Sequence, residues 1–427
     1  MGRVSTRNFW LWAIGLHAVY FLYALVQGPN LLNDSQEYLL QAGNLNEGYF
    51  AYCGDPSYPL DYFDFSKRPP LYPLILWLCG TTSFWWGILF FQNSLSLLTI
   101  YILRNVLQNR GFYNPLWFGV LVSSSIPYFI YVNSIMSEVI LVAGVTAMLY
   151  HYHNFLKLKK GRAAWLFNLM LAAVVFTKPV FFPFVVINAL FWLILHRKYA
   201  MSTLLPIVLV ALFFWRNTEV TGKPHFSSIA YINLLDYNAY YFNVETKGVA
   251  YADSVGDNTH AVLNKTSGFL EKAGYMQSIA IQEIGRDWPA YFWFHLKGAF
   301  RGMVDPGNFD LRTFFNADNS VGFLKTLNEK GWQGIPEILN AMPWLYLLLL
   351  LISLLNKVLL LLGFLFFILK PGIDPNWRWA LTGIVFYVVL ITGPINASRF
   401  MLAVWPVVII CTVQAFTLKG KVRTLIR

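Results

Sequence analysis

The chain has 427 residues, of which 57% are hydrophobic and only 12% are charged. About a quarter of the residues of a soluble domain are charged, so this composition excludes an ordinary cytosolic enzyme, a disordered protein and a disulfide scaffold. The net charge of +11 does not point to nucleic acid, because much of the basic excess collects in short loops on one side of the apolar segments.

Apolar runs recur from one end of the chain to the other and predict about ten membrane-spanning helices. The predicted spans are residues 9–28, 83–103, 115–132, 138–152, 164–178, 181–195, 201–216, 342–369, 377–394 and 400–418. We expect an all-α polytopic membrane protein in three parts. These are an N-terminal transmembrane module (1–216), an outer segment of mixed structure (217–341) and three C-terminal transmembrane helices (342–427).

Charge separates the predicted loops into two sides. The short loops and tails of one side carry sixteen Lys and Arg residues and a single acid, Asp374. Positive residues concentrate in the cytoplasmic loops of membrane proteins, so we expect both termini in the cytoplasm. The polar segments 29–82 and 217–341 then face outward, and the second holds 13 of the 21 acidic residues. Any polar chemistry is expected on that outer side.

The first outer segment begins with the acids Asp34 and Glu37, which stand just after the first span. An Asp followed by a Glu three residues later is the pattern of a capping box at the start of a helix. The same pair also suits acid–base catalysis, because a carboxylate near apolar walls can accept a proton from a nucleophile. The apolar residues that follow fall on one helical face, which predicts a helix lying along the membrane surface, and Leu74–Cys79 predicts a second one. Those residues are Tyr38, Leu39, Ala42 and Leu45.

Lys67 and Arg68 form a basic pair on the outer side, contrary to the general charge pattern. Together they suit a phosphate, since Arg68 offers a forked donor and Lys67 a point charge. Alternatively, the pair matches the nearby acids Asp61 and Asp64. The prolines that follow Arg68 exclude a regular helix through this pair.

Three further cations, Lys178, Arg216 and Arg399, stand at the outer ends of predicted spans. Each alone could extend to lipid headgroups, but together with Arg68 they suit an anionic lipid-linked substrate. Glu138 opens the fourth span, where a carboxylate favours the helix dipole. It is also a candidate second carboxylate that assists Asp34 or holds a metal.

The second outer segment is predicted to mix helix and loop. Residues 227–242 are aromatic and polar, residues 287–303 read as an amphipathic helix at the membrane surface, and residues 305–332 read as a loop rich in Gly, Asn and Asp.

Taken in order along the chain, these short motifs resemble the GT-C superfamily of integral-membrane glycosyltransferases. The nearest branch is the group of protein O-mannosyltransferases and aminoarabinose lipid A transferases. The resemblance covers roughly residues 1–220 and 377–418. The motifs that carry it are Asp34 to Tyr38, Arg68-Pro69-Pro70-Leu71-Tyr72, Ser137-Glu138, Thr177-Lys178-Pro179 and Ser398-Arg399-Phe400.

The resemblance implies transfer of a sugar from a polyprenyl-phosphate donor in the membrane to an acceptor hydroxyl or phosphate outside. It implies Asp34 as the base and Arg68 as the group that holds the donor phosphate, with Lys178 and Arg399 sharing that role. From the residues themselves, Glu37 and Glu138 are further candidate carboxylates, and Lys67 and Arg216 are further candidate cations. Lys67 stands where aminoarabinose enzymes have a Glu linked to metal binding. A divalent metal therefore stays open, and no other cofactor is expected.

The acceptor, a glycan, lipid or protein, is not identified by the sequence. Candidate acceptor or sugar contacts are Asn233, Tyr237 and Asn238. We expect a bacterial inner (plasma) membrane and no nucleic-acid partner. Two alternatives use the same outer cations: a flippase or transporter of lipid-linked saccharides, and a polysaccharide polymerase or ligase. The basic-Pro-Pro motif after an acidic first loop favours the transferase.

Overall fold

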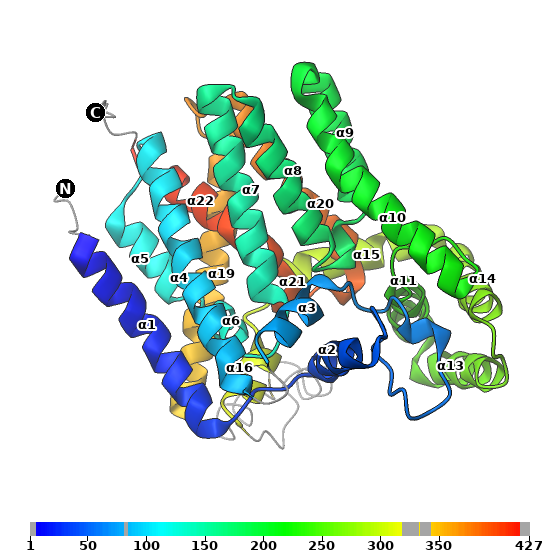
Figure 1. Cartoon of the computed structure of the whole chain (residues 1–427). Helices are drawn as coiled ribbons and strands as arrows, with labels where there is room; N and C mark the ends of the chain where they lie inside the picture. The colour runs from blue at the N-terminus through cyan, green and yellow to red at the C-terminus, as the bar shows by residue number, and fades with distance from the viewer. Residues whose placement is uncertain (1–5, 81–83, 318–332, 334–342, 419–427) are drawn as a thin grey trace.

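The computed structural model describes residues 6–80, 84–317, 333 and 343–418 (Figure 1). Within these residues the regular structure is helical, and the β pairing found is one isolated bridge between Asn30 and Ser134. The α-helices of the N-terminal module are α1 (Thr6–Gln27), α2 (Asn33–Asn44), α3 (Leu71–Leu78), α4 (Trp85–Arg110), α5 (Pro115–Ser123), α6 (Ile126–Val132), α7 (Glu138–Leu158), α8 (Gly161–Val175), α9 (Phe184–Leu195) and α10 (Leu204–Thr221).

The remaining helices form the outer segment and the C-terminal part. They are α11 (Ile229–Ile232), the π-helix η5 (Asn233–Ala239), α12 (Tyr240–Lys247), α13 (Val249–Leu263), α14 (Phe269–Gly285), α15 (Trp288–Val304), α16 (Asn308–Phe314), α19 (Trp344–Leu369), α20 (Pro375–Thr392), α21 (Ser398–Met401) and α22 (Trp405–Phe416). Short 3-10 turns include η3 (Pro179–Phe181), η4 (Arg197–Thr203) and η7 (Gly393–Ile395).

Six helical segments of the described chain are long and apolar enough to cross a membrane: α1, α4, α7, α10 with η4, α19, and α21 to α22. The pair α5 and α6 bends by 63° and would make a seventh if it forms one broken span. Every predicted run overlaps a helix or this bent pair, but the predicted count of ten spans is not confirmed. At 1.5 Å per residue, the 15 residues of α8 reach only about 22 Å, short of an apolar core of about 30 Å.

Large apolar side chains cover the outside of the bundle as well as its centre. Ile194 of α9 is 74% exposed and Val19 of α1 is 66% exposed. A water-facing helix would carry polar groups at such positions, so these faces are suited to lipid. Of the six candidate spans, α7 and the segment from Ser398 to Phe416 are the best enclosed by protein.

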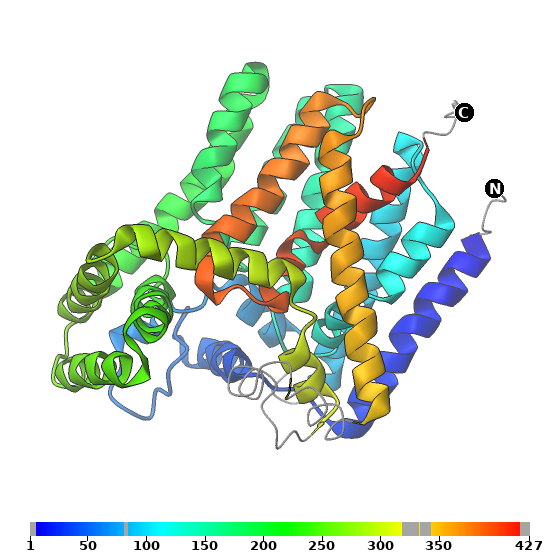
Figure 2. The ribbon, with the colours of Figure 1, turned by 180° about the vertical axis from the view of Figure 1, so that it is seen from behind.

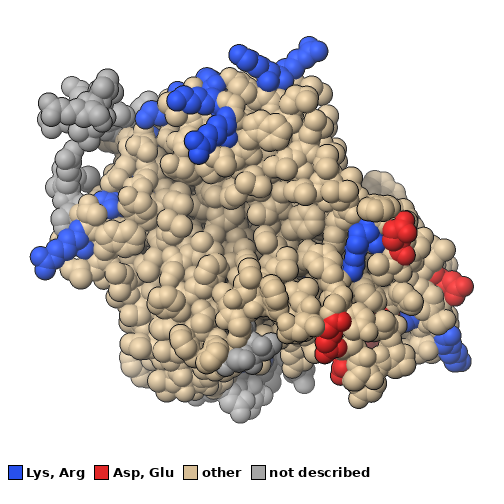
Figure 3. Space-filling view, in the orientation of Figure 1, with Lys and Arg blue, Asp and Glu red and all other residues tan. Residues whose placement is uncertain are grey.

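The two ends of the bundle differ in charge. In Figure 1 the α7–α8 turn and the far end of α9 lie at the top, while α2, α16 and α13 lie at the bottom. In Figure 3, Lys and Arg side chains lie over the upper end, and the Asp and Glu side chains visible on that face lie toward the lower right. The start of α1 and the end of α22 both point toward the upper, basic end, as the reverse view also shows (Figure 2).

The two predicted surface helices of the first outer segment are present as α2 and α3. The predicted capping box is wrong in its residues. Helix α2 begins after Leu32, and the hydroxyl of Ser35 accepts the Leu32 amide at 2.9 Å. Asp34 therefore lies inside the first turn, with its carboxylate available for other partners.

The second outer segment is more helical than predicted. Helices α11 to α14 with η5, here called the peripheral helices, share a small apolar core that includes Leu235, Leu263 and Phe269. The predicted amphipathic helix is α15, which starts one residue later than expected. Part of the predicted 305–332 loop is helix α16, and residues 318–332 lie outside the described residues.

Candidate functional site

Seven of the predicted site residues meet at the acidic end of the bundle. They form a network, called here the charged cluster: Asp34, Glu37, Lys67, Arg68, Glu138, Lys178 and Arg399. The convergence of Arg68, Lys178 and Arg399 is confirmed, although these residues are more than a hundred positions apart in the chain.

Asp34 lies between two arginines. Its Oδ1 accepts Arg68 Nη2 at 2.7 Å, and its Oδ2 accepts Arg399 Nη2. One turn along α2, Glu37 binds the other edge of the Arg68 guanidinium and pairs with Lys67 at 2.6 Å. Residues three apart share a helix face, so α2 presents both carboxylates to the same guanidinium.

The second half of the cluster is centred on Glu138, its most deeply buried side chain. Glu138, the first residue of α7, has a side chain only 2% exposed. Its Oε1 lies 2.9 Å from both Lys178 Nζ and Arg399 Nε. Arg399 therefore joins the two halves, because it contacts both Asp34 and Glu138.

The loop that carries Lys67 and Arg68 is fixed by backbone contacts. Pro69 and Pro70 stop the helix from extending backward, and α3 starts at Leu71. The Arg68 carbonyl accepts the Gln41 amide at 3.1 Å, and the Lys67 carbonyl accepts the Ser227 hydroxyl at 2.9 Å. The two cations are thereby held on the α2 side of the loop.

Arg216 is not brought into the charged cluster. Its guanidinium donates to the backbone carbonyls of Phe65 and Phe50 and lies over the rings of both. Since Phe65 precedes the basic pair by two residues, Arg216 holds the shape of the first outer segment. The sequence placed this arginine at the correct end of its helix but could not show that loop carbonyls bind it.

The charges of the cluster leave a cationic excess, with four cations against three carboxylates. Burial by itself would raise the pKa of Asp34, but Arg399, Arg68 and Lys178 together lower that pKa below its ordinary value. Burial would lower the pKa of Lys67, and its bond to Glu37 raises it instead. Asp34 is thus an ionised carboxylate at neutral pH.

Two acids that the sequence did not single out position Arg399. The amide of Ser398 donates to Asp305 at 2.7 Å, and the hydroxyl of Ser398 donates to Asp310. Asp310 also accepts the Tyr131 hydroxyl at 2.7 Å. Burial raises the pKa of Asp310 to about 6, with Asp305 adding to the shift and the bonds from Ser398 and Tyr131 opposing it.

Both acids come from the segment predicted as a loop rich in Gly, Asn and Asp. Nothing in that composition distinguished these two acids from the other polar residues. Gly307, between them, has a φ of +80°, and a Cβ there would lie 2.8 Å from Pro127 and 2.9 Å from Asp310. Only glycine fits this turn without displacing its neighbours.

The candidate acceptor residues lie on η5, away from the ion pairs of the cluster. The Asn238 amide donates to the Asn233 carbonyl at 2.7 Å, and its Oδ1 accepts the Tyr291 hydroxyl of α15. Tyr237 is 42% exposed. Asn233 and Asn238 thus have local partners, and the structure gives these three residues no assigned contact with the cluster.

The described residues contain no group of three or more His, Cys, Asp or Glu side chains placed to hold a metal ion. Comparison with models of known protein families gives no match, and comparison with curated protein sequences gives none either. The function is therefore argued from the geometry of the charged cluster and from the motifs of the sequence.

Proposed function

We propose that the protein is a membrane glycosyltransferase of the GT-C type that uses a polyprenyl-phosphate sugar as donor. The observation that carries this proposal is the charged cluster, in which Arg68, Lys178 and Arg399 converge on the partly buried Asp34 and the buried Glu138. Converging cations repel one another unless anions compensate them. The internal acids leave an excess of one positive charge, which suits an anionic headgroup.

In the proposed reaction, an acceptor hydroxyl attacks the anomeric carbon of the donor sugar. The new carbon–oxygen bond forms as the bond from that carbon to the phosphate oxygen breaks, and the electron pair stays on the phosphate. Asp34 takes the hydroxyl proton. The polyprenyl phosphate that leaves is a dianion, which Arg68, Arg399 and Lys178 stabilise.

The lowered pKa of Asp34 has a consequence for this mechanism. A carboxylate held by two arginines is a weak base. A donor phosphate competes for the same guanidinium groups, so its binding draws Arg68 and Arg399 away from Asp34 and raises the pKa of that carboxylate. Donor binding would thereby prepare the base for the acceptor.

The membrane arrangement follows from the same proposal. The ten helical segments that match the predicted runs would lie in the membrane or partly cross it, with the short α8 and α9 inserted beside full spans. The basic end would face the cytoplasm and the charged cluster the outside. The cell membrane would be the bacterial inner membrane, and the acceptor would be a glycan, lipid or protein outside.

A test of the proposal uses the purified full chain in lipid nanodiscs with a panel of polyprenyl-phosphate sugars labelled in the sugar. We expect the wild type to release or transfer label from at least one donor, and Arg399→Gln to lose this activity. Asp55→Asn, which removes a fully exposed acid of the same outer segment, is the matched control and should stay active. A panel in which no donor loses label, with a protein that remains folded, would contradict the proposal.

The bent pair α5–α6 supports a flippase of lipid-linked saccharides as the second candidate. Broken helices beside buried polar groups are typical of transport sites. The break at Ser124–Ser125 lies against Asn356 of α19, whose amide donates to Ser124 at 2.7 Å. Movement of a labelled lipid saccharide across a liposome without cleavage would favour this candidate, and cleavage would favour the transferase.

A further inference from the structure

The chain between α10 and α11, here called the linking segment (residues 222–228), binds the loop that carries the basic pair. The two lie side by side in Figure 1. The Ser227 hydroxyl donates to the Lys67 carbonyl at 2.9 Å, and the Ser228 hydroxyl donates to the Phe63 carbonyl at 2.5 Å. The position of the basic pair therefore depends on the linking segment.

A buried histidine makes a third contact between the two segments, here called the latch. Nε2 of His225 lies 2.6 Å from the hydroxyl of Ser66, the residue before Lys67, and Nδ1 lies 2.8 Å from the Lys223 carbonyl. A carbonyl only accepts, so Nδ1 carries the proton and the neutral Nε2 accepts from the Ser66 hydroxyl. His225 and Ser66 are 5% and 0% exposed, so water does not readily replace this bond.

The ring of His225 is held in one orientation. The Asn217 amide donates to the carbonyls of His225 and Phe226 at 2.9 and 3.1 Å. Phe269 of α14 stacks on the imidazole, with 4.5 Å between ring centroids. Among the described residues, this imidazole is the partner of the Ser66 hydroxyl. Loss of the acceptor would leave a buried hydroxyl without a bond.

Two cations, Lys223 and Arg216, act on the His225 ring, and no carboxylate of the described residues does. Tyr231 of α11 is the titratable group facing the ring, and α14 faces it with the uncharged Phe269. Burial lowers the pKa of His225 below its ordinary 6.5. The bond to the Lys223 carbonyl opposes this shift, and the two cations add to it. The folded protein therefore keeps the ring neutral at neutral pH.

Protonation of the ring reverses its role toward Ser66. An imidazolium only donates, so Nε2 no longer accepts the hydroxyl, and the new charge lies near two cations. The pKa in the folded protein is lowered, so the stabilising contribution of the neutral ring is fully present above about pH 6.5. It is lost as the pH falls through the lowered pKa.

We propose that His225 is a positioning residue that latches the basic pair through Ser66, and that protonation of its ring opens the latch and weakens phosphate binding at the charged cluster. Lys67 directly follows Ser66, so movement of Ser66 shifts Lys67 and the bonds of Arg68 to α2. This regulation rests on the proposed function, in which the cluster holds a donor phosphate.

A histidine that only fills space makes a different prediction. Phenylalanine would then replace it without effect, since the ring would still stack on Phe269. The pH dependence of the wild type alone does not separate the two roles, because burial raises the pKa of Asp310 to about 6. Variants of His225 are therefore compared with the wild type at each pH.

The first measurement is the affinity of the full chain in nanodiscs for undecaprenyl phosphate, from the ligand concentration that raises the thermal midpoint. His225→Gln keeps an oxygen acceptor for Ser66 and does not titrate. From about pH 7.5 to about pH 5, we expect the affinity of the wild type to fall by about three- to tenfold more than that of this variant. At about pH 7.5, His225→Phe should bind about three- to tenfold more weakly than the wild type.

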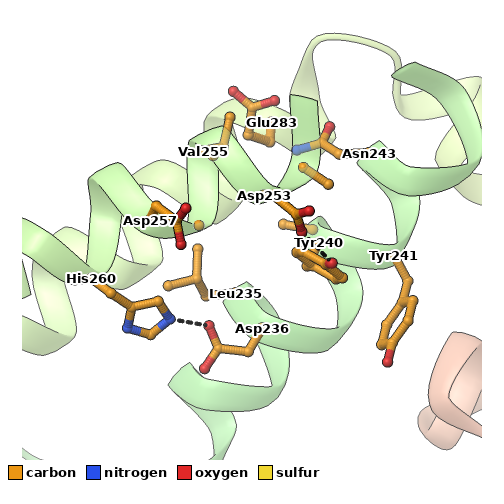
Figure 4. Close-up of a pocket in the computed structure, with 13 residues that line it drawn as sticks. Leu235, Asp236, Tyr240, Tyr241, Asn243, Asp253, Val255, Asp257, His260 and Glu283 are labelled. Atoms are coloured by element: carbon orange, nitrogen blue, oxygen red, sulfur yellow. Dashed lines mark hydrogen bonds and ion pairs between the residues drawn. The ribbon is translucent and has the colours of Figure 1, made fainter. Parts of the chain in front are cut away.

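The second measurement needs no ligand. Hydrogen–deuterium exchange of residues 63–68, corrected for the intrinsic effect of pH, should show protection that the wild type loses at about pH 5 and His225→Gln keeps. Ser66→Ala should lose this protection at both pH values. His260→Gln is the matched control and should behave as the wild type, because His260 is an exposed histidine of α13 that pairs with Asp236 (Figure 4).

Equal pH dependence of the wild type and His225→Gln, or an unchanged affinity in His225→Phe, would overturn the latch. Protection of residues 63–68 that does not change with pH in the wild type would overturn it as well. A wild type that binds no undecaprenyl phosphate, but loses protection on acidification while His225→Gln keeps it, would contradict the proposed function and support the latch.

Discussion

The charged cluster and the peripheral helices differ in how deeply their ion pairs are buried. In the cluster, Glu138 and Arg68 have side chains only 2% and 12% exposed. In the peripheral helices, part of which Figure 4 shows, Lys247 and Arg286 pair with Glu283, and these two cations are 29% and 48% exposed. Breaking a buried pair leaves a charge without a partner or water, whereas water replaces an exposed partner, so the cluster depends more on its ion pairs.

The two regions also differ in how the chain assembles them. The cluster gathers side chains from α2, the loop before α3, α7, the turn between α8 and η3, and α21, so it exists only when the whole bundle is packed. The peripheral helices are one continuous stretch of chain, from Ile229 to Gly285. Changes in the cluster should therefore alter the stability of the bundle, while changes in the peripheral helices should act locally.

The largest expected effect comes from Asp34→Asn, which removes the proposed base and keeps the shape of the side chain. Loss of a positioned base typically costs 10²–10⁴-fold in turnover, so we expect sugar transfer to fall by about that factor. Near-normal sugar transfer by the variant would leave Glu37 or Glu138 as the base.

Glu138→Gln should have the largest effect on stability. It leaves Lys178 without its buried partner and Arg399 with Asp34 alone, and breaking a buried ion pair costs about 3–5 kcal/mol. We expect a clear fall in the thermal midpoint in nanodiscs. Adding Lys178→Gln should restore part of it.

The control is Glu245→Gln in the peripheral helices, whose partner Lys297 is 65% exposed. An exposed pair contributes about 0–1 kcal/mol, so its midpoint should hardly move. Equal shifts for Glu138→Gln and Glu245→Gln would contradict the distinction between the two regions.

Asp310 gives the protein a pH dependence that its removal should abolish. Burial raises the pKa of this carboxyl from 3.8 to about 6, so the folded protein holds this proton more tightly than the unfolded chain does. The stabilising contribution is fully present below about pH 4 and is lost as the pH rises through about 6. Asp310→Asn resembles the neutral form. The thermal midpoint of the variant minus that of the wild type should therefore rise as the pH increases from 4 to 7. A constant difference between the two proteins over this range would contradict the assignment.

Arg68→Lys tests the smallest of these effects, the value of the forked donor. The variant keeps the charge but cannot hold both Asp34 and Glu37, or two phosphate oxygens, in the same way. We expect the affinity for undecaprenyl phosphate to fall by about tenfold, measured by the ligand concentration that raises the thermal midpoint. Undecaprenol, which lacks the phosphate, is the matched control and should not distinguish the variant from the wild type.

The sequence predicted the parts of the fold that depend on local pattern. Apolar length located the helical segments, and Pro69-Pro70 marked the break before α3. The distribution of charge between the two sides of the predicted spans placed Arg68, Lys178 and Arg399 at the same outer level. Three cations that converge there require a shared anion or carboxylates. That reasoning predicted their convergence on shared carboxylates without knowledge of the packing.

Other features depend on contacts that a local pattern cannot show. Asp34 matched a capping box, but Ser35 satisfies the Leu32 amide because α2 starts two residues earlier than the capping box required. Arg216 resembled the other outer cations, but carbonyls of a distant loop bind it. Asp310 stood in a polar segment without periodicity, and its role depends on Tyr131 and Ser398 from two other helices.

The most direct test of the central claim is an experimental structure of the protein in nanodiscs with undecaprenyl phosphate bound. The account predicts a phosphate within hydrogen-bond distance of both Arg68 and Arg399, with Asp34 released from at least one of the two arginines. The prenyl chain should leave the cluster toward the membrane. A phosphate bound elsewhere on the protein, with every ion pair of the charged cluster intact, would contradict the account.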